Sequence, residues 1–200
     1  MILREAILSG EVGAGHELSL TDTAENLRVS RTPVREAFQL LESEGLLELR
    51  MNRGAVVKPI NRKFIADHFD MRSMLEGEAV YRAIKNNMPT DALRTLQDEI
   101  SRMDEIPDDV YDDYNARFHQ AFWYAAGNDR LFSFLDTLWN GPTYSHTSGK
   151  QVEHGKSVVE HGLILESAEA HDAEKARAVM QKHIERSMRI ILASKISSPE

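Results

Sequence analysis

The segment spanning residues 29–49, VSRTPVREAFQLLESEGLLEL, limits the possible fold more than any other part of the sequence. It opens with a serine, a proline and two arginines, and continues with apolar residues at the spacing of one helix face. Proline is tolerated in the first turn of a helix, and glycine is common just after the last turn. The segment therefore predicts a helix from about Arg31 to Glu44 that stops at Gly45.

The segments around this helix complete a known arrangement. Two shorter helical patterns precede it, at residues 2–9 and in DTAENLR, with Thr21 or Asp22 as the cap of the second. Two strand-like runs, LLELR and AVVKPI, follow it on either side of MNRG and predict a hairpin. Three helices followed by a hairpin form a winged helix-turn-helix, in which the third helix enters the major groove of DNA.

After residue 60 the pattern becomes entirely helical. Pro59 and Asn61 mark the boundary, and no strand signal follows them. Helices are expected at about 62–86, 90–103, 108–126, 129–145, 153–170 and 172–195. The sequence therefore predicts a mostly α protein with two domains: a winged helix-turn-helix at residues 1–60 and an all-α helical bundle at residues 61–200.

Composition narrows the possible functions. The 200 residues include no cysteine, which excludes disulfides and thiolate metal sites. The sequence has no recognisable signal peptide or membrane-spanning run, so a cytoplasmic protein without a membrane partner is expected. The net charge of −8 argues against a protein that merely coats nucleic acid, because such proteins are basic. Any contact with DNA must come from a local cluster of cations.

Arg31 and Arg35 form such a cluster. They are four residues apart and lie on one face of the first helical turn. Cations at this end oppose the helix dipole, so stability alone favours acids here. Guanidinium groups match phosphates and guanine edges, and Arg53 and Gly54 at the hairpin tip suit a wing that touches DNA. From the residues alone, DNA contact and a solvated turn stay equally open.

The first sixty residues resemble the GntR family of bacterial transcription regulators. The resemblance is carried by LREAILSGEVGAGHEL, VSRTPVREAFQLLESEGLLEL and MNRGAVV, in the family's order. It implies DNA contacts led by Arg31 and Arg35, and a wing glycine at Gly54 that permits close approach to DNA. The DNA-binding residues expected in this way are Arg28, Ser30, Arg31, Thr32, Val34, Arg35, Arg53 and Gly54. Thr23 and Arg28 depart from the family's usual leucine and glycine, and Arg28 either adds a phosphate contact or strains the turn.

Three of the eight histidines have a spacing that suits a metal site. Asn115 and His119 are four residues apart on one expected helix face. His161 and His183 each lie eleven residues from a turn near Asp172, so they are level if the two helices run antiparallel. Three imidazoles suit zinc, nickel and similar ions. Hydrogen-bonded packing histidines are the alternative.

Residues 64–195 resemble the ligand-sensing FCD domain of the FadR subfamily of GntR proteins, through MRSMLEGEAVYRAI, NARFHQAFWYAAGN and EHGLILESAEAHDAEKARAVMQKHIERS. The resemblance implies a divalent metal held by an aspartate and three histidines. The matching positions are Asn115, His119, His161 and His183. Asparagine in the aspartate position is a neutral and weaker ligand. Arg72 is a candidate cation for an effector, with a salt bridge to Glu76 as the alternative.

These patterns together predict a ligand-responsive transcription regulator, a repressor as in most of the family. It binds a near-palindromic operator as a homodimer and senses a small carboxylate at a site that holds a divalent metal, zinc or nickel. Two other classes stay open. Three histidines with an open metal position resemble a hydrolytic zinc site, which would make the chain an enzyme. The metal itself could also be the signal, which would make the chain a pure metal sensor.

Overall fold

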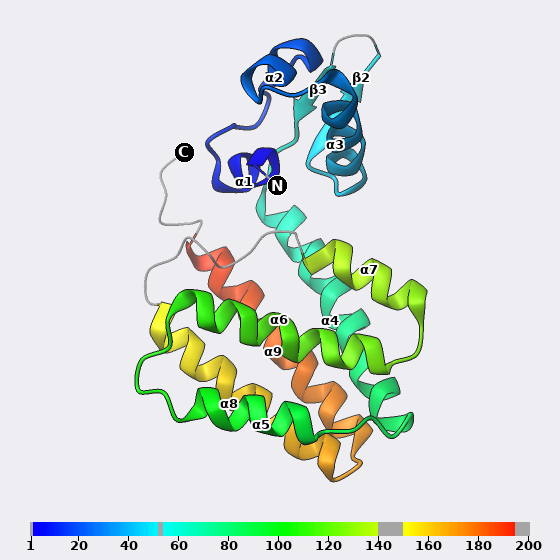
Figure 1. Ribbon diagram of the computed structural model, residues 1–200, viewed down its shortest axis with the longest axis vertical. Coiled ribbons are helices and arrows are strands. Elements are labelled where there is room, and N and C mark those ends of the chain that lie inside the picture. Colours follow the sequence, from blue (N-terminus) through cyan, green and yellow to red (C-terminus); the bar gives the residue numbers. More distant parts are fainter. Residues whose placement is uncertain (1, 52–53, 140–149, 195–200) are drawn as a thin grey trace. The chain divides into compact units, whose positions relative to one another are not determined.

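A computed structural model gives the fold of the chain (Figure 1). It describes residues 2–51, 54–139 and 150–194. The chain divides into two compact units, Met1–Ile65 and Ala66–Glu200. Helix α4 (Arg62–Lys85) begins at the end of the first unit and continues in the second.

The first unit has the predicted order of helices and hairpin, with one further strand. Its helices are α1 (Ile2–Ser9), α2 (Leu20–Asn26) and α3 (Arg31–Ser43). Its strands are β1 (Glu17–Leu18), β2 (Leu47–Arg50) and β3 (Gly54–Val57), which pair antiparallel in the order β1-β3-β2. Strand β1 was not predicted, because two residues are too few to show an alternating pattern.

The ends of α2 differ in detail from the prediction. Its cap is Ser19 rather than Thr21 or Asp22, and the Ser19 hydroxyl accepts a hydrogen bond from the backbone N–H of Asp22 at 3.3 Å. In the turn after α2, the backbone of Arg28 has a φ of 54°, which is the left-handed region. A side chain there strains the backbone by about 1–2 kcal/mol. The backbone strain expected at Arg28 is therefore present, and a contact of its side chain with phosphate stays a prediction.

The sheet itself requires a glycine at position 54. Gly54 has a φ of 88°, and a Cβ at this position would lie 2.0 Å from the backbone oxygen of Leu18 in β1. No residue with a side chain fits where β3 passes β1. The family resemblance connected Gly54 with close approach to DNA. The structure shows that the packing of the first unit by itself requires a glycine here.

The core of the first unit takes buried apolar side chains from each of its helices and strands. These are Ile7, Leu18, Ala24, Val34, Phe38, Leu41, Leu46, Leu47, Ala55 and Val57. Val34 is 2% exposed. This corrects the prediction that Val34 contacts DNA, because its side chain packs inward against the core and cannot reach a groove.

The second unit continues with α4 and is built from helices throughout the residues that the structure describes. The others are α5 (Asp91–Ser101), α6 (Asp108–Ala125), α7 (Asp129–Trp139), α8 (Lys150–Glu169) and α9 (Ala173–Ser194). Each predicted helix is present, and the described ends agree with the prediction to within three residues. The predicted continuation of α7 to residue 145 lies outside the described residues. Among the described helices, none is both long and apolar enough to span a membrane.

The turn between α8 and α9 sets the level at which the two helices face each other. His171 follows α8 with a φ of 56°, and the Asp172 carboxylate accepts the backbone N–H of Lys175 at 3.0 Å, which caps α9. The two helices then pack side by side, and α8 also contacts α5 and α6 (Figure 1). Side chains from α6, α8 and α9 can therefore meet inside this unit.

Candidate DNA-binding turn and candidate metal centre

The first turn of α3 presents two unpaired guanidinium groups. Arg31 and Arg35 are exposed, and within the described part of the chain neither has a hydrogen-bond or ion-pair partner. In contrast, Arg4 of α1 pairs with Glu44. Cations at a helix N-terminus oppose the dipole. No described residue of the first unit pairs with either guanidinium group, so the arrangement favours an external anion as their partner.

The rest of this turn is also available to an anion. Ser30 is the N-cap residue of α3, but its side chain makes no capping hydrogen bond, and the first turn contains no acid. Thr32 and Arg28 are exposed. The first N–H groups of a helix commonly bind phosphate. Arg53 lies outside the described residues.

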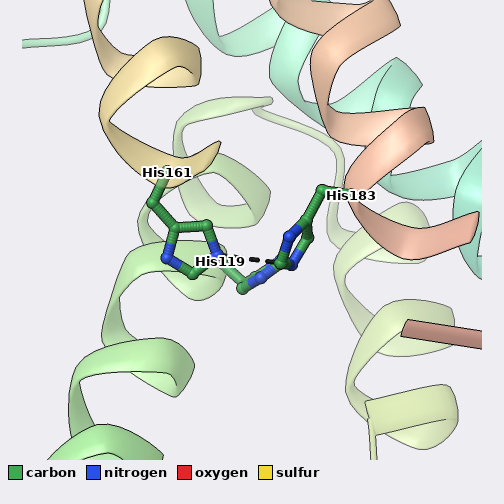
Figure 2. Close-up of side chains that lie close together, drawn as sticks. All are labelled: His119, His161 and His183. Carbon is green, nitrogen blue, oxygen red and sulfur yellow. Dashed lines mark hydrogen bonds between the residues drawn. The ribbon is translucent and has the colours of Figure 1, made fainter. Parts of the chain in front are cut away.

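Three buried histidines meet inside the second unit (Figure 2). His119 of α6, His161 of α8 and His183 of α9 are 0%, 0% and 4% exposed. One ring nitrogen of each lies within 4.8 Å of those of the other two. The Nε2 atoms of His161 and His183 are 3.3 Å apart. The predicted convergence of these three side chains is therefore present.

Glu76 of α4 holds His119. Its fully buried carboxylate contacts Nδ1 of His119 and accepts the indole N–H of Trp123 at 3.2 Å. Arg72 donates to Glu76 Oε1 at 3.1 and 2.6 Å, which confirms the predicted salt bridge. Burial by itself raises the pKa of Glu76, but its interactions with His119 and Arg72 outweigh burial and lower the pKa from 4.5 to about 2. The ionised carboxylate can only accept, so Nδ1 of His119 donates to it.

Glu160 of α8 holds His183 in a similar way. Its Oε2 accepts from His183 Nδ1 at 2.6 Å, and Arg186 donates to Oε1 and Oε2 at 2.6 and 2.8 Å. Burial raises the pKa of Glu160, but the hydrogen bonds from His183 and Arg186 lower it to about 2. Burial also lowers the pKa of His183 to about 4. The His183 ring is therefore neutral near pH 7, with its Nε2 lone pair facing the other histidines.

His161 has an uncharged partner. Its Nδ1 lies 3.0 Å from the hydroxyl oxygen of Tyr114, and its ring stacks on Phe118 with centroids 4.1 Å apart. Burial lowers the pKa of His161 well below 6.5, and the neighbouring histidines add to the effect. Burial also raises the pKa of the Tyr114 hydroxyl, so this group keeps its proton.

The histidine set suits a divalent transition metal. Two nitrogens bound to a tetrahedral zinc ion lie roughly 3.3 Å apart, given zinc–nitrogen bonds of about 2.0–2.1 Å. The Nε2 atoms of His161 and His183 have this separation, 3.3 Å. Nε2 of His119 is buried and has no hydrogen-bond partner among the described residues, which a bound cation would supply. Carboxylates behind two of the rings are the usual means of orienting metal-binding histidines.

Two other predicted residues lie around this set. Asn115 is one turn before His119 in α6, and its Oδ1 lies 3.5 Å from the hydroxyl of Tyr111. The Arg72 guanidinium lies 4.9 Å from the ring centre of Trp139. The role of Asn115 as a metal ligand and that of Arg72 in effector binding stay predictions.

Sequence reasoning missed the groups that hold all three histidines, since it named Glu76 only as a partner of Arg72. Glu160 and Tyr114 bond to histidines 23 and 47 residues away along the chain. Such pairs join different helices, so neither shows the spacing of neighbours on one helix face.

Comparison with known families agrees with both units. The profile of the FCD domain matches residues 67–186, and that of the bacterial regulatory proteins of the gntR family matches residues 1–57. The HTH-type transcriptional regulator BphR of Paraburkholderia xenovorans is 28% identical over 200 residues, which cover 94% of this chain and 82% of BphR. The Uxu operon regulator of Haemophilus influenzae is 27% identical over 205 residues, which cover 92% of this chain and 77% of that protein.

The fold agrees as well. The solved structure of E. coli McbR/YncC superposes with a TM-score of 0.74 at 24% identity, and the match covers 97% of this chain and 95% of that one. With a GntR-type helix-turn-helix unit followed by an FCD domain, the chain belongs to the gntR family of bacterial transcription regulators, in the FadR-type group, and is a regulator rather than an enzyme.

Proposed function

We propose that this regulator binds a near-palindromic operator as a homodimer, represses transcription there, and is released by a small carboxylate that binds at a divalent metal ion in the FCD domain. Zinc or nickel is the proposed ion. The observation that carries the proposal is the convergence of His119, His161 and His183, with one ring nitrogen of each within 4.8 Å of the others. A bound ion would supply an open coordination position for a carboxylate oxygen.

The charges around the histidines support an anionic effector. Glu76 is paired with Arg72 and Glu160 with Arg186, so these carboxylates have their own counter-charges and leave the charge of a bound ion largely uncompensated. Asn115, the proposed fourth ligand, adds no negative charge. An uncompensated buried charge is unfavourable, and a carboxylate bound to the ion would reduce it.

On the DNA side, the exposed first turn of α3 supports contact with the major groove. In a dimer, the two winged helix-turn-helix units would bind two half-sites of the operator. The dimer would therefore place two such turns about 34–36 Å apart. Guanidinium groups in this turn would contact guanine edges or phosphates, and the wing would contact the backbone. The proposed contacts are Arg28, Ser30, Arg31, Thr32, Arg35, Arg53 and Gly54.

Native mass spectrometry of the freshly purified protein, followed by operator titrations, tests this proposal. The expected species is a dimer with one metal ion per subunit. His119→Gln should lose the ion, whereas His16→Gln, which changes an exposed histidine of the first unit, should keep it. Equal metal content in both variants would remove the histidine set from the proposal.

The operator titration separates effector from metal. A duplex selected from a random library serves as operator, and its affinity is measured with zinc alone and with zinc plus citrate, acetate or other small carboxylates. Release by a carboxylate only in the presence of metal is the expected result. A change in affinity caused by zinc alone would identify a metal sensor instead.

A further inference from the structure

We infer that Gln97, on α5, is a positioning residue: through Tyr114 it fixes the tautomer of His161 that can bind a metal. This inference rests on the proposed metal site. Gln97 is 5% exposed and belongs to a helix that provides none of the three histidines. Its effect on His161 passes through two hydrogen bonds, one between Gln97 and Tyr114 and one between Tyr114 and His161.

The orientation of the Gln97 amide is fixed by a group that can only accept. Its Nε2 donates to the backbone oxygen of Val158 at 2.9 Å and to the Ser101 hydroxyl at 3.1 Å. A carbonyl oxygen has no proton to give, so the amide nitrogen must face Val158, and Oε1 must face the other way. Gly162 leaves room for this arrangement, since a Cβ there would lie 3.3 Å from Gln97 Nε2.

The amide orientation then determines the direction of the Tyr114 hydroxyl. Gln97 Oε1 and Tyr114 Oη are 2.5 Å apart. Because Oε1 can only accept, the single hydroxyl proton of Tyr114 is used in this bond. Toward His161, Tyr114 Oη offers only a lone pair. The 3.0 Å contact between Tyr114 Oη and His161 Nδ1 is therefore a hydrogen bond only if Nδ1 carries the proton.

The tautomer of His161 decides whether its Nε2 can bind a cation. A neutral imidazole carries one proton, so protonated Nδ1 leaves a lone pair on Nε2. In the other tautomer, the Nε2 proton would point at Nε2 of His183, 3.3 Å away, where the carboxylate of Glu160 has already placed a lone pair. A hydrogen bond between the two rings would then occupy both nitrogens that the metal needs.

For His161, the bonded pair of Gln97 and Tyr114 takes the place of the ionised carboxylate that holds each of the other two histidines. Glu76 and Glu160 can only accept, so each fixes its own histidine directly. Tyr114 can donate or accept, and alone it would permit both tautomers of His161. The bond to Gln97 removes this choice. Gln97 is itself held by the backbone oxygen of Val158, which belongs to the same helix as His161.

Nitrogen NMR of metal-free protein labelled with ¹⁵N-histidine tests the inference directly. Long-range ¹H–¹⁵N spectra distinguish a protonated from an unprotonated ring nitrogen, and a His161→Gln spectrum assigns the signals. The expected result for the unchanged protein near pH 7 is a protonated Nδ1 and an unprotonated Nε2 at His161. A protonated Nε2 would overturn the inference, whether or not the protein binds metal.

Two variants and a control complete the test. Gln97→Met releases the Tyr114 hydroxyl, which can then donate to Nδ1, and Tyr114→Phe removes it. Both should shift His161 toward the Nε2-protonated tautomer and weaken binding of Zn²⁺ alone by about 10–100-fold. Ser101→Ala leaves the bond between Gln97 and Val158 in place and should change neither the tautomer of His161 nor the affinity for Zn²⁺.

The outcomes separate this inference from the proposed function. If the tautomer is as expected and shifts in both variants but no protein binds zinc, the positioning role stands and the metal site fails. If zinc binding weakens while the tautomer stays the same, Gln97 acts only through packing and the inference fails. Far-ultraviolet circular dichroism checks that each variant is folded. If neither Gln97→Met nor Tyr114→Phe folds, the NMR spectrum of the unchanged protein decides the case.

Discussion

Lowering the pH from 7 to 5 should strongly destabilise the second unit of the metal-free protein. Burial lowers the pKa of His68 from 6.5 to about 4, with a smaller contribution from the charge of Arg72. Burial lowers the pKa of His183 to about 4 as well. Both groups bind a proton more readily in the unfolded state, so stability increases with pH in this range. The stabilisation is complete above pH 6.5 and is lost as the pH falls toward 4.

The magnitude follows from the two pKa values of each histidine. A group with a pKa of 6.5 unfolded and about 4 folded loses about 2 kcal/mol of stabilisation between pH 7 and pH 5. The two histidines together should lower the free energy of unfolding by about 4 kcal/mol. Globular domains have a total stability of only about 5–15 kcal/mol, so the metal-free unit should be close to unfolding at pH 5.

Urea unfolding with a chelator at pH 7, 6 and 5 measures this effect. The protein's two tryptophans, Trp123 and Trp139, both belong to the second unit and report on its unfolding by fluorescence. His68→Gln should reduce the difference between pH 7 and 5 by about 2 kcal/mol. Zinc should oppose the acid destabilisation by competing with protons at His183, and it should leave the part due to His68 unchanged. An unfolding free energy that is the same at pH 7 and pH 5 would refute the reasoning.

Three further predictions concern single substitutions. Arg35→Ala should weaken specific operator binding by about 1–3 kcal/mol in gel-shift titrations, while Arg130→Ala, an exposed cation of the second unit, should not. Arg28→Gly should stabilise the first unit by about 1 kcal/mol in thermal unfolding, since glycine relieves the backbone strain at a φ of 54°; a lower melting temperature would contradict this. Asn115→Asp should increase the metal retained after dialysis by adding a charged oxygen, and equal retention would show that position 115 is not a ligand.

The helices of both units could be predicted because the signals for a helix are local. The spacing of apolar residues and the breaks at proline and glycine gave the course of α3 and of the helices that follow. Strand β1 depends on its pairing with β3, where Leu18 lies opposite Ala55, and no local pattern announces such a contact. Val34 shows a related limit. The family motif places it among the DNA contacts, while its position on the apolar face of α3 buries it.

The meeting of the histidines could also be predicted, because the turn near Asp172 brings His161 and His183 to the same level. Their hydrogen-bond partners could not. Glu76 has a local partner, Arg72, at the four-residue helix spacing, and this pair conceals the contact between Glu76 and His119, 43 residues further along. Which interhelical contact a buried carboxylate makes depends on helix packing that the sequence pattern does not specify.

The mixture of charged and neutral partners suggests why such a site would respond to a metabolite. A further carboxylate in place of Asn115 or Tyr114 would partly neutralise a bound ion and hold it whether or not an effector is present. With neutral groups at both positions, the proposed effector supplies the missing negative charge, so it and the metal should strengthen each other's binding. Because such coupling is reciprocal, a carboxylate that increases zinc affinity by some factor must itself bind more tightly by the same factor in the presence of zinc. Calorimetric titrations of each ligand with and without the other measure both factors, and independent binding of the two would show that the carboxylate site is not at the histidines.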